Sequence, residues 1–251
     1  MSARVTKFLI EHPVMVGLGV FCSILVGLSE ISGFNLRELV RLWKSGEPAA
    51  LSDEVRSTLR LRLRKLASDG ALSVDESQDL RGYVASLKLE AQAAERYLSE
   101  IEPRMLHAAR DWLVGAELAA QERFPEARAR CREATRLDDE SSMAWANLGG
   151  ASLELGALAD AEAALRKALA LEPDSIEAHY NFGACLAAQN RGAAALDHLE
   201  RSLTLLLRGD APPTFGRQAL LDDLQKNVHF SSLRASPRFA ALIQRAQNDF
   251  R

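Results

Sequence analysis

The C-terminal half of the chain repeats itself with a period of 34 residues. Residues 107–140, 141–174 and 175–208 align with one another without gaps. The middle copy has the clearest pattern, and its characteristic positions are Trp145, Leu148, Gly149, Gly156, Ala161, Leu165, Ala168 and Pro173. All three copies keep the glycine of position 149 and the alanine of position 161. A gapless repeat of this length restricts the chain to an array of similar units.

Each copy has the pattern of a helical hairpin. A glycine on one helix and an alanine on its partner let the two backbones approach to the close end of the packing range of ~8–10 Å, while bulky residues one turn away fill the gap. One hairpin cannot bury its own apolar face, so successive hairpins must stack. We therefore predict an all-α fold in which three hairpins form a right-handed superhelix. Its inner surface is made mainly by the first helix of each pair.

On these residues, the segment 107–208 resembles the tetratricopeptide-repeat family. Three positions depart from the family pattern. Ser152 replaces the usual aromatic residue of the middle copy, Asp111 replaces the tryptophan of the first copy, and Asn190 occupies the turn glycine of the third. Asparagine tolerates the left-handed backbone conformation, so this last change need not break the turn. The resemblance implies a non-catalytic domain that binds another protein.

The resemblance also places a shallow apolar groove on the first helices of the three copies. Its predicted lining residues are Trp112 and Ala116, then Met143, Ala146, Asn147, Gly150 and Leu153, then Tyr180 and Ala184. Small residues leave room for an incoming backbone, so a peptide or helix with apolar anchors is the expected ligand. The alternative is that the chain's own connector or tail helix covers these residues.

Some family members bind a peptide's terminal carboxylate with a clamp of basic residues and asparagine. Asn147 and Asn181 match the asparagine type of that clamp, whereas Trp112 and Glu177 stand where basic residues are needed. The resemblance therefore does not extend to carboxylate binding.

The uncharged segment PVMVGLGVFCSILVGL occupies residues 13–28. A membrane-spanning helix needs roughly 17–25 apolar residues, a length that this segment reaches with Ser29 and its flanks. A cleaved signal peptide is the alternative, but no Ala-x-Ala-like site follows the apolar core. We therefore predict an N-terminal transmembrane helix within residues 1–33, which contacts the membrane through residues 13–29.

The basic residues on either side of this segment predict its orientation. Arg37, Arg41 and Lys44 on the C-terminal side outnumber Arg4 and Lys7 on the N-terminal side. Because basic residues favour the cytoplasmic side, we expect a single-pass protein of the bacterial inner membrane with its repeats in the cytoplasm.

Gly19, Ser23 and Gly27 recur every four residues within the apolar segment. Such a face would let two anchor helices approach closely and form a homo-oligomer. Small residues without a pairing role explain the same pattern, so both interpretations stay open.

Residues 34–104 are predicted to connect the anchor to the repeats through a short juxtamembrane helix and a helical hairpin. The first hairpin helix carries an apolar stripe: Val55, Leu59, Leu63 and Leu66. Ser73 and Glu76 form a capping box that opens the second helix, which we expect to stop near Pro103.

The turn of this hairpin matches part of an EF-hand calcium loop. Four residues fit positions five, six, eight and twelve of that loop: Asp69, Gly70, Leu72 and Glu76. Lys65 and Ala67 fall at positions one and three, where oxygen ligands are required. A plain hairpin is favoured, and a regulatory sensor in which residues 55–102 switch docking is the alternative function.

Charge and motifs exclude several other classes of protein. With 31 Lys and Arg against 34 Asp and Glu, the net charge of −3 gives no general attraction for nucleic acid. The sequence has no P-loop, G-x-S-x-G, H-E-x-x-H or dinucleotide-binding motif. Cys131 and His179 stand at positions usually held by large core residues, and His198 and His229 have no partner at ligand or catalytic spacing. We therefore expect no enzymatic activity, no metal and no cofactor.

Four segments result: residues 1–33 as the anchor, 34–104 as the connector, 105–208 as the repeats and 209–251 as capping helices. The tail resembles the closing segment of bacterial repeat arrays, and Ser236-Pro237 should begin its last helix. The predicted function is a membrane-anchored scaffold or assembly factor that binds another protein through the groove.

Overall fold

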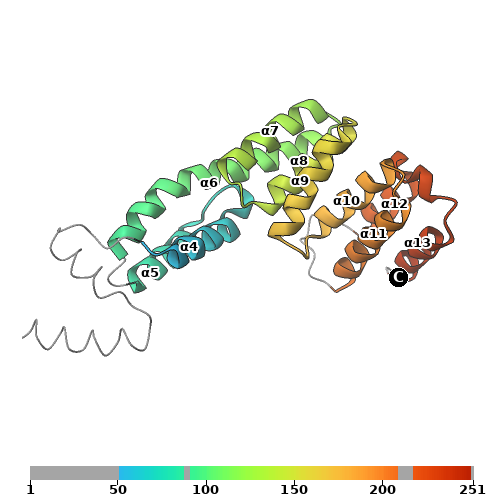
Figure 1. Ribbon diagram of the computed structural model, residues 1–251. Helices are drawn as coiled ribbons and strands as arrows, with labels where there is room; N and C mark the ends of the chain where they lie inside the picture. The colour runs from blue at the N-terminus through green and yellow to red at the C-terminus, as the bar shows by residue number, and fades with distance from the viewer. Residues whose placement is uncertain (1–50, 88–90, 209–216, 250–251) are drawn as a thin grey trace, which may run out of the picture. The chain divides into compact units, whose positions relative to one another are not determined.

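The computed structural model describes residues 51–87, 91–208 and 217–249. Across these ranges every regular element is a helix (Figure 1). The described residues divide into two compact units, residues 51–56 with 82–87 and 91–97, and residues 57–81 with 98–208 and 217–249. The repeats belong to the second unit.

The predicted membrane anchor, residues 1–33, and the predicted juxtamembrane helix after it lie outside the described residues. Within the described ranges, no helix combines the length and the apolar character needed to cross a bilayer.

In the connector hairpin, a short 3-10 helix and a glycine link the two α-helices. Helix α4 spans Asp53–Leu66, the 3-10 helix η1 spans Ala67–Asp69 and helix α5 spans Val74–Ser86. Gly70 follows η1 with φ of +80°, a left-handed conformation that suits glycine. The predicted capping box is confirmed: the Ser73 N–H donates to Glu76 Oε2 at 2.8 Å, and the Glu76 N–H donates to Ser73 Oγ at 3.2 Å. The Glu76 carboxylate therefore caps a helix, and none of the described residues form a cluster of three or more metal-ligating side chains.

Helix α6 spans Ala91–Ala120 and passes through Pro103, so the prediction of a helix end near this residue is wrong. A proline inside a helix costs about 3 kcal/mol, because it removes a hydrogen bond and crowds the preceding turn. Three side chains on one face of α6, Leu98, Ile101 and Met105, are buried around this point. Their packing offsets the cost of Pro103, and the expected boundary at residues 104 and 105 falls inside a continuous helix.

The repeats form helical hairpins, as the 34-residue period predicts. The end of α6 pairs with α7 (Phe124–Leu137), α8 (Ser142–Glu154) pairs with α9 (Leu158–Leu171), and α10 (Ile176–Ala188) pairs with α11 (Gly192–Leu207). The hairpin turns place a left-handed residue at the same position of each copy: Glu122 at φ +59°, Gly156 at +71° and Asn190 at +60°. Asn190 thus adopts the conformation expected of it.

A small residue at one position of each repeat allows the paired helices to approach closely. A Cβ added to Gly149 would lie 2.5 Å from Leu165 Cγ, and one added to Gly183 would lie 2.7 Å from Leu199 Cγ. These separations are far below van der Waals contact. The shared glycine therefore sets the distance between the two helices of each hairpin.

Three further helices follow the third repeat: α12 (Arg217–Lys226), the 3-10 helix η3 (Val228–Leu233) and α13 (Pro237–Asp249). Figure 1 shows these elements beside α10 and α11. Phe230 and Phe239 are fully buried in the core that they share with the third repeat. The tail therefore packs on the third repeat, and α13 begins at Pro237.

Candidate functional site

Five of the predicted groove residues remain partly exposed. Trp112 and Ala116 lie on α6, and Met143, Asn147 and Gly150 lie on α8. Four of these residues are small or apolar and Asn147 adds a polar amide, all from the first helices of the first two repeats. They are the part of the predicted groove that an external ligand can reach.

The other four predicted groove residues are buried, with exposed fractions of 0% for Ala146, 2% for Leu153, 8% for Tyr180 and 2% for Ala184. Ala146 packs with Ala168 and Ala178, where α8, α9 and α10 meet. Leu153, Tyr180 and Ala184 belong to the main core. None of the four lines an open surface.

The tail covers the third repeat on the side where the groove was expected. The Tyr180 hydroxyl donates a hydrogen bond to Asp223 of α12, and the Tyr180 ring meets the Phe230 ring edge-on with centroids 5.8 Å apart. Burial raises the pKa of Tyr180, and the neighbouring Asp223 carboxylate raises it further. Ser232 Oγ also donates to the Ala187 carbonyl at 3.1 Å. The chain's own tail therefore occupies this part of the groove, the alternative left open by the sequence.

The tail also reaches the second repeat. His229 Nε2 lies 3.2 Å from Glu154 Oε1, which connects η3 to the end of α8. The partly exposed residues of the predicted groove therefore all lie on α6 and α8.

Of the positions compared with a carboxylate clamp, Asn181 is hydrogen-bonded within the fold and Glu177 is an acidic residue with restricted exposure. Asn181 Nδ2 donates to the Ala146 carbonyl at 3.4 Å, and an added Cβ on Gly150 would lie 3.0 Å from the same nitrogen. Burial raises the pKa of the Glu177 carboxyl. Neither side chain supplies the positive charge that binding a terminal carboxylate requires.

Two family models described as tetratricopeptide repeats match the chain, over residues 115–176 and 152–204. Residues 115–204 are tetratricopeptide repeats. Repeats of this family bind peptide or protein partners.

Among solved structures, the chain is similar to YrrB, described as a TPR protein with an unusual peptide-binding site. The two chains are 18% identical, and the similarity covers 68% of this chain and 83% of the other, with a TM-score of 0.40. No curated protein matches the chain.

The two described cysteines of the tetratricopeptide repeats are packing residues. Burial raises the pKa of the Cys131 thiol to about 12, with a further contribution from Asp111, and burial raises that of Cys185 to about 11. A nucleophilic cysteine instead needs a lowered pKa and access to solvent. Cys131 also lies beside Gly115, whose added Cβ would come within 2.4 Å of its sulfur.

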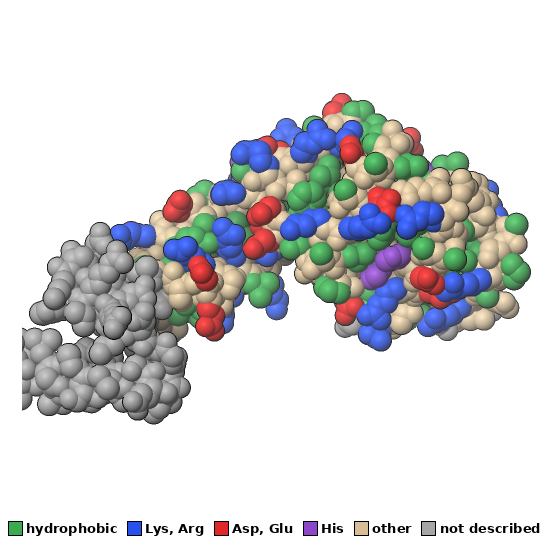
Figure 2. Space-filling view, in the orientation of Figure 1, with side chains coloured by type: hydrophobic (Ala, Val, Ile, Leu, Met, Phe, Trp, Pro, Cys, Tyr) green, Lys and Arg blue, Asp and Glu red, His purple; other side chains and the backbone are tan. Residues whose placement is uncertain are grey.

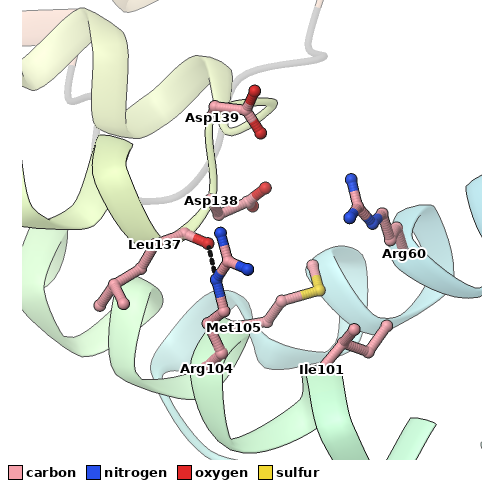
Figure 3. A pocket seen from close by; sticks show the side chains of 7 residues that line it. All are labelled: Arg60, Ile101, Arg104, Met105, Leu137, Asp138 and Asp139. Atoms are coloured by element: carbon pink, nitrogen blue, oxygen red, sulfur yellow. Dashed lines mark hydrogen bonds between the residues drawn. The ribbon is translucent and has the colours of Figure 1, made fainter. Parts of the chain in front are cut away.

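A small hollow of about 20 Å³ lies beside the first tetratricopeptide repeat (Figure 3). Arg104 Nε donates to the Leu137 carbonyl at its wall, at 2.7 Å. Next to it, Arg64 of α4 binds both carboxylate oxygens of Asp138, at 2.7 and 2.8 Å. The hollow has room for about one water molecule, so these residues join α4 to the repeats rather than form a ligand site.

His179 and His198 form a pair that the sequence analysis missed. His179 Nδ1 lies 2.8 Å from His198 Nδ1, and His179 Nε2 lies 3.0 Å from the Pro173 carbonyl. Because a carbonyl only accepts, His179 carries its proton on Nε2, and His198 donates to the bare Nδ1. Histidine side chains reach the surface over α10 and α11 (Figure 2).

The signal for this pair was a spacing of 19 residues across each hairpin. At the equivalent positions, Arg130 Nη1 donates to Asp111 Oδ1 at 3.1 Å in the first repeat. In the second repeat, Trp145 packs against the cluster that contains Ala164. The two positions therefore face each other in all three repeats.

The histidine pair predicts that acidification destabilises the domain. Burial lowers the pKa of both His179 and His198. The unfolded chain, with histidine pKa values of about 6.5, therefore takes up protons first as the pH falls. Stability is fully present above about pH 6.5 and declines below it, which urea unfolding between pH 8 and pH 5 measures.

His198→Gln should flatten this decline, because it removes one titrating ring while its amide still donates to His179. Comparing the two proteins at pH 8, where both rings are neutral, separates the packing effect of the substitution. A variant whose stability falls with pH as steeply as that of the natural chain would contradict the assignment.

Proposed function

We propose that this chain is a non-catalytic docking protein that holds or assembles a partner protein at the bacterial inner membrane. The observation that carries the proposal is the partly exposed set Trp112, Ala116, Met143, Asn147 and Gly150 on α6 and α8. The tail fills the third repeat but leaves this set accessible. An apolar surface bounded in this way suits a short helix or extended peptide with a few apolar anchors.

The membrane tether is the second part of the proposal, and the sequence supports it. The uncharged residues 13–28 and the basic residues after them favour an uncleaved anchor with cytoplasmic repeats. Tethering raises the effective concentration of the domain for a partner held in the same membrane. A reporter fused to the C-terminus that is active in the periplasm would overturn the orientation.

Pairing of anchors through Gly19, Ser23 and Gly27 would present two docking surfaces side by side. This arrangement would strengthen the capture of a partner that offers two binding segments.

Substitution of Trp112 and Met143 by aspartate should strongly reduce partner capture without unfolding the domain. Both side chains are partly exposed, so a charge on each disrupts apolar contact with a ligand more than it disrupts the core. Crosslinking of the full chain in native membranes, followed by mass spectrometry, measures the loss. We expect a reduction of roughly tenfold or more in the crosslinked partner.

Val114→Asp is the matched control, because Val114 is an exposed apolar residue of α6 outside the predicted groove. It introduces one aspartate on the same helix as Trp112 and should leave capture unchanged, and it is compared with Trp112→Asp alone as well as with the double variant. Tyr180 is not a suitable target, because its substitution would release the tail. Undiminished crosslinking by the double variant would reject the groove.

A further inference from the structure

A cavity of about 360 Å³ lies among α7, α8 and α9, and none of the predicted groove residues lines it. Trp145 and Leu148 of α8 and Ala164 of α9 form its apolar wall. Over these helices, Figure 2 shows apolar side chains bordered by Lys and Arg side chains. Because an apolar cavity of about 150 Å³ accommodates a benzene ring, this one has room for an aromatic side chain.

Ser152 is one of the residues that line the cavity, and its short side chain leaves space there. The positions 34 residues before and after it hold Leu118 and Leu186, and Leu186 is buried with an exposed fraction of 1%. In the third repeat, a leucine therefore fills the space that Ser152 leaves empty in the second. The middle repeat lacks one large side chain among its helices.

The bottom of the cavity carries a polar atom without a partner. Ser152 is 1% exposed, and no described residue forms a hydrogen bond with its Oγ. Nε of Arg128, which also lines the cavity, is likewise buried without a partner among the described residues. A buried hydroxyl without a hydrogen bond costs free energy, so a ligand with a polar tip would gain by reaching it.

The rim of the cavity is positively charged. Arg128 forms an ion pair with Asp160, which neutralises both. Arg132 and Lys167 also line the cavity, and none of the described acidic side chains pairs with either. An approaching segment with negative charge would therefore be favoured.

We propose that this cavity binds a tyrosine side chain carried by an acidic segment of a partner protein. The tyrosine ring supplies the apolar volume that position 152 lacks, and its hydroxyl reaches Ser152 Oγ. Acidic residues beside the tyrosine meet Arg132 and Lys167. Tyrosine is suited to such a site because it combines a large rigid apolar ring with a polar tip.

The chain's undescribed segments cannot supply this tyrosine. The sequence has three tyrosines, Tyr83, Tyr97 and Tyr180, and all of them lie in the described ranges. Tyr180 is buried under the tail. We therefore place the tyrosine on a partner molecule.

A seven-residue peptide with one central tyrosine between acidic residues tests the proposal. The full chain, labelled with ¹⁵N in detergent micelles, is titrated while the Trp145 indole N–H resonance is followed. We expect a saturable shift of this resonance. A phenylalanine peptide should bind about fivefold more weakly because it lacks the hydroxyl, and a leucine peptide more weakly still.

Ser152→Leu should weaken binding of the tyrosine peptide by roughly tenfold or more while leaving the melting temperature at or above that of the natural chain. Leucine adds apolar volume at the bottom of the cavity and removes the hydroxyl, and the equivalent Leu186 is buried. Lys167→Glu, at an exposed rim position, should also weaken binding without touching the core. Trp112→Asp should leave the peptide bound, which separates this site from the proposed groove.

Three results would overturn the proposal: no shift of the Trp145 resonance with the tyrosine peptide, equal affinity for Ser152→Leu, or equal affinity for the leucine peptide. Loss of the peptide in Trp112→Asp would also overturn it, because binding would then occur at the groove.

Discussion

Replacing Phe230 with alanine is expected to lower the free energy of unfolding by about 3–5 kcal/mol. Phe230 is fully buried, and its ring lies 5.8 Å from the centroids of both Tyr180 and Phe239. Truncation leaves a cavity where η3, α10 and α13 meet, and the surrounding helices can close only part of it. Urea unfolding of the full chain measures the change.

The same substitution should loosen the tail and expose the third repeat. Backbone amides of α10 should then exchange hydrogen faster, while those in the middle of α8 change less. Val228→Ala is the matched control, since Val228 belongs to the same helix η3 and is 70% exposed. An equal loss of stability in both variants, or none in Phe230→Ala, would contradict the role assigned to the tail.

The sequence predicted the hairpins because their determinants are local and periodic. Gly149 and Gly183 lie where helices cross closely, and Asn190 lies at a turn that needs a left-handed residue. Each of these requirements acts on the backbone at a single position. The 34-residue spacing repeats them, so that three weak signals reinforce one another.

Helix α6 shows where local rules fail. Pro103 is a strong local signal for a helix end, yet the helix continues because Ile101 and Met105 are buried beside it. The free energy of that packing depends on which residues, distant in the sequence, lie opposite Ile101 and Met105. The periodicity of the sequence does not identify those residues.

The burial of four predicted groove residues was missed for a related reason. The repeat register indicates which face of a helix Tyr180 occupies, but not which segment covers that face. Its partners, Asp223 and Phe230, come from a tail that does not repeat. By contrast, the pair of His179 with His198 was open to prediction, because the two positions face each other in every repeat.

Gly183→Val is expected to destabilise the third repeat by about 3 kcal/mol. The first added carbon would already lie 2.7 Å from Leu199 Cγ and 3.1 Å from the Ala195 carbonyl oxygen. The leucine could change its rotamer, but the carbonyl belongs to the backbone of α11 and cannot move without separating the two helices. Thermal unfolding followed by circular dichroism measures the loss.

Gly82→Val provides the matched control, because Gly82 lies within α5 and an added Cβ would meet nothing within 4 Å. There the substitution removes only the conformational freedom of glycine, so stability should stay about the same or rise slightly. If both variants lost stability equally, the cost would come from valine in a helix and not from helix separation. A loss confined to Gly183→Val would instead establish that close backbone approach, set by one hydrogen atom per repeat, holds each hairpin together.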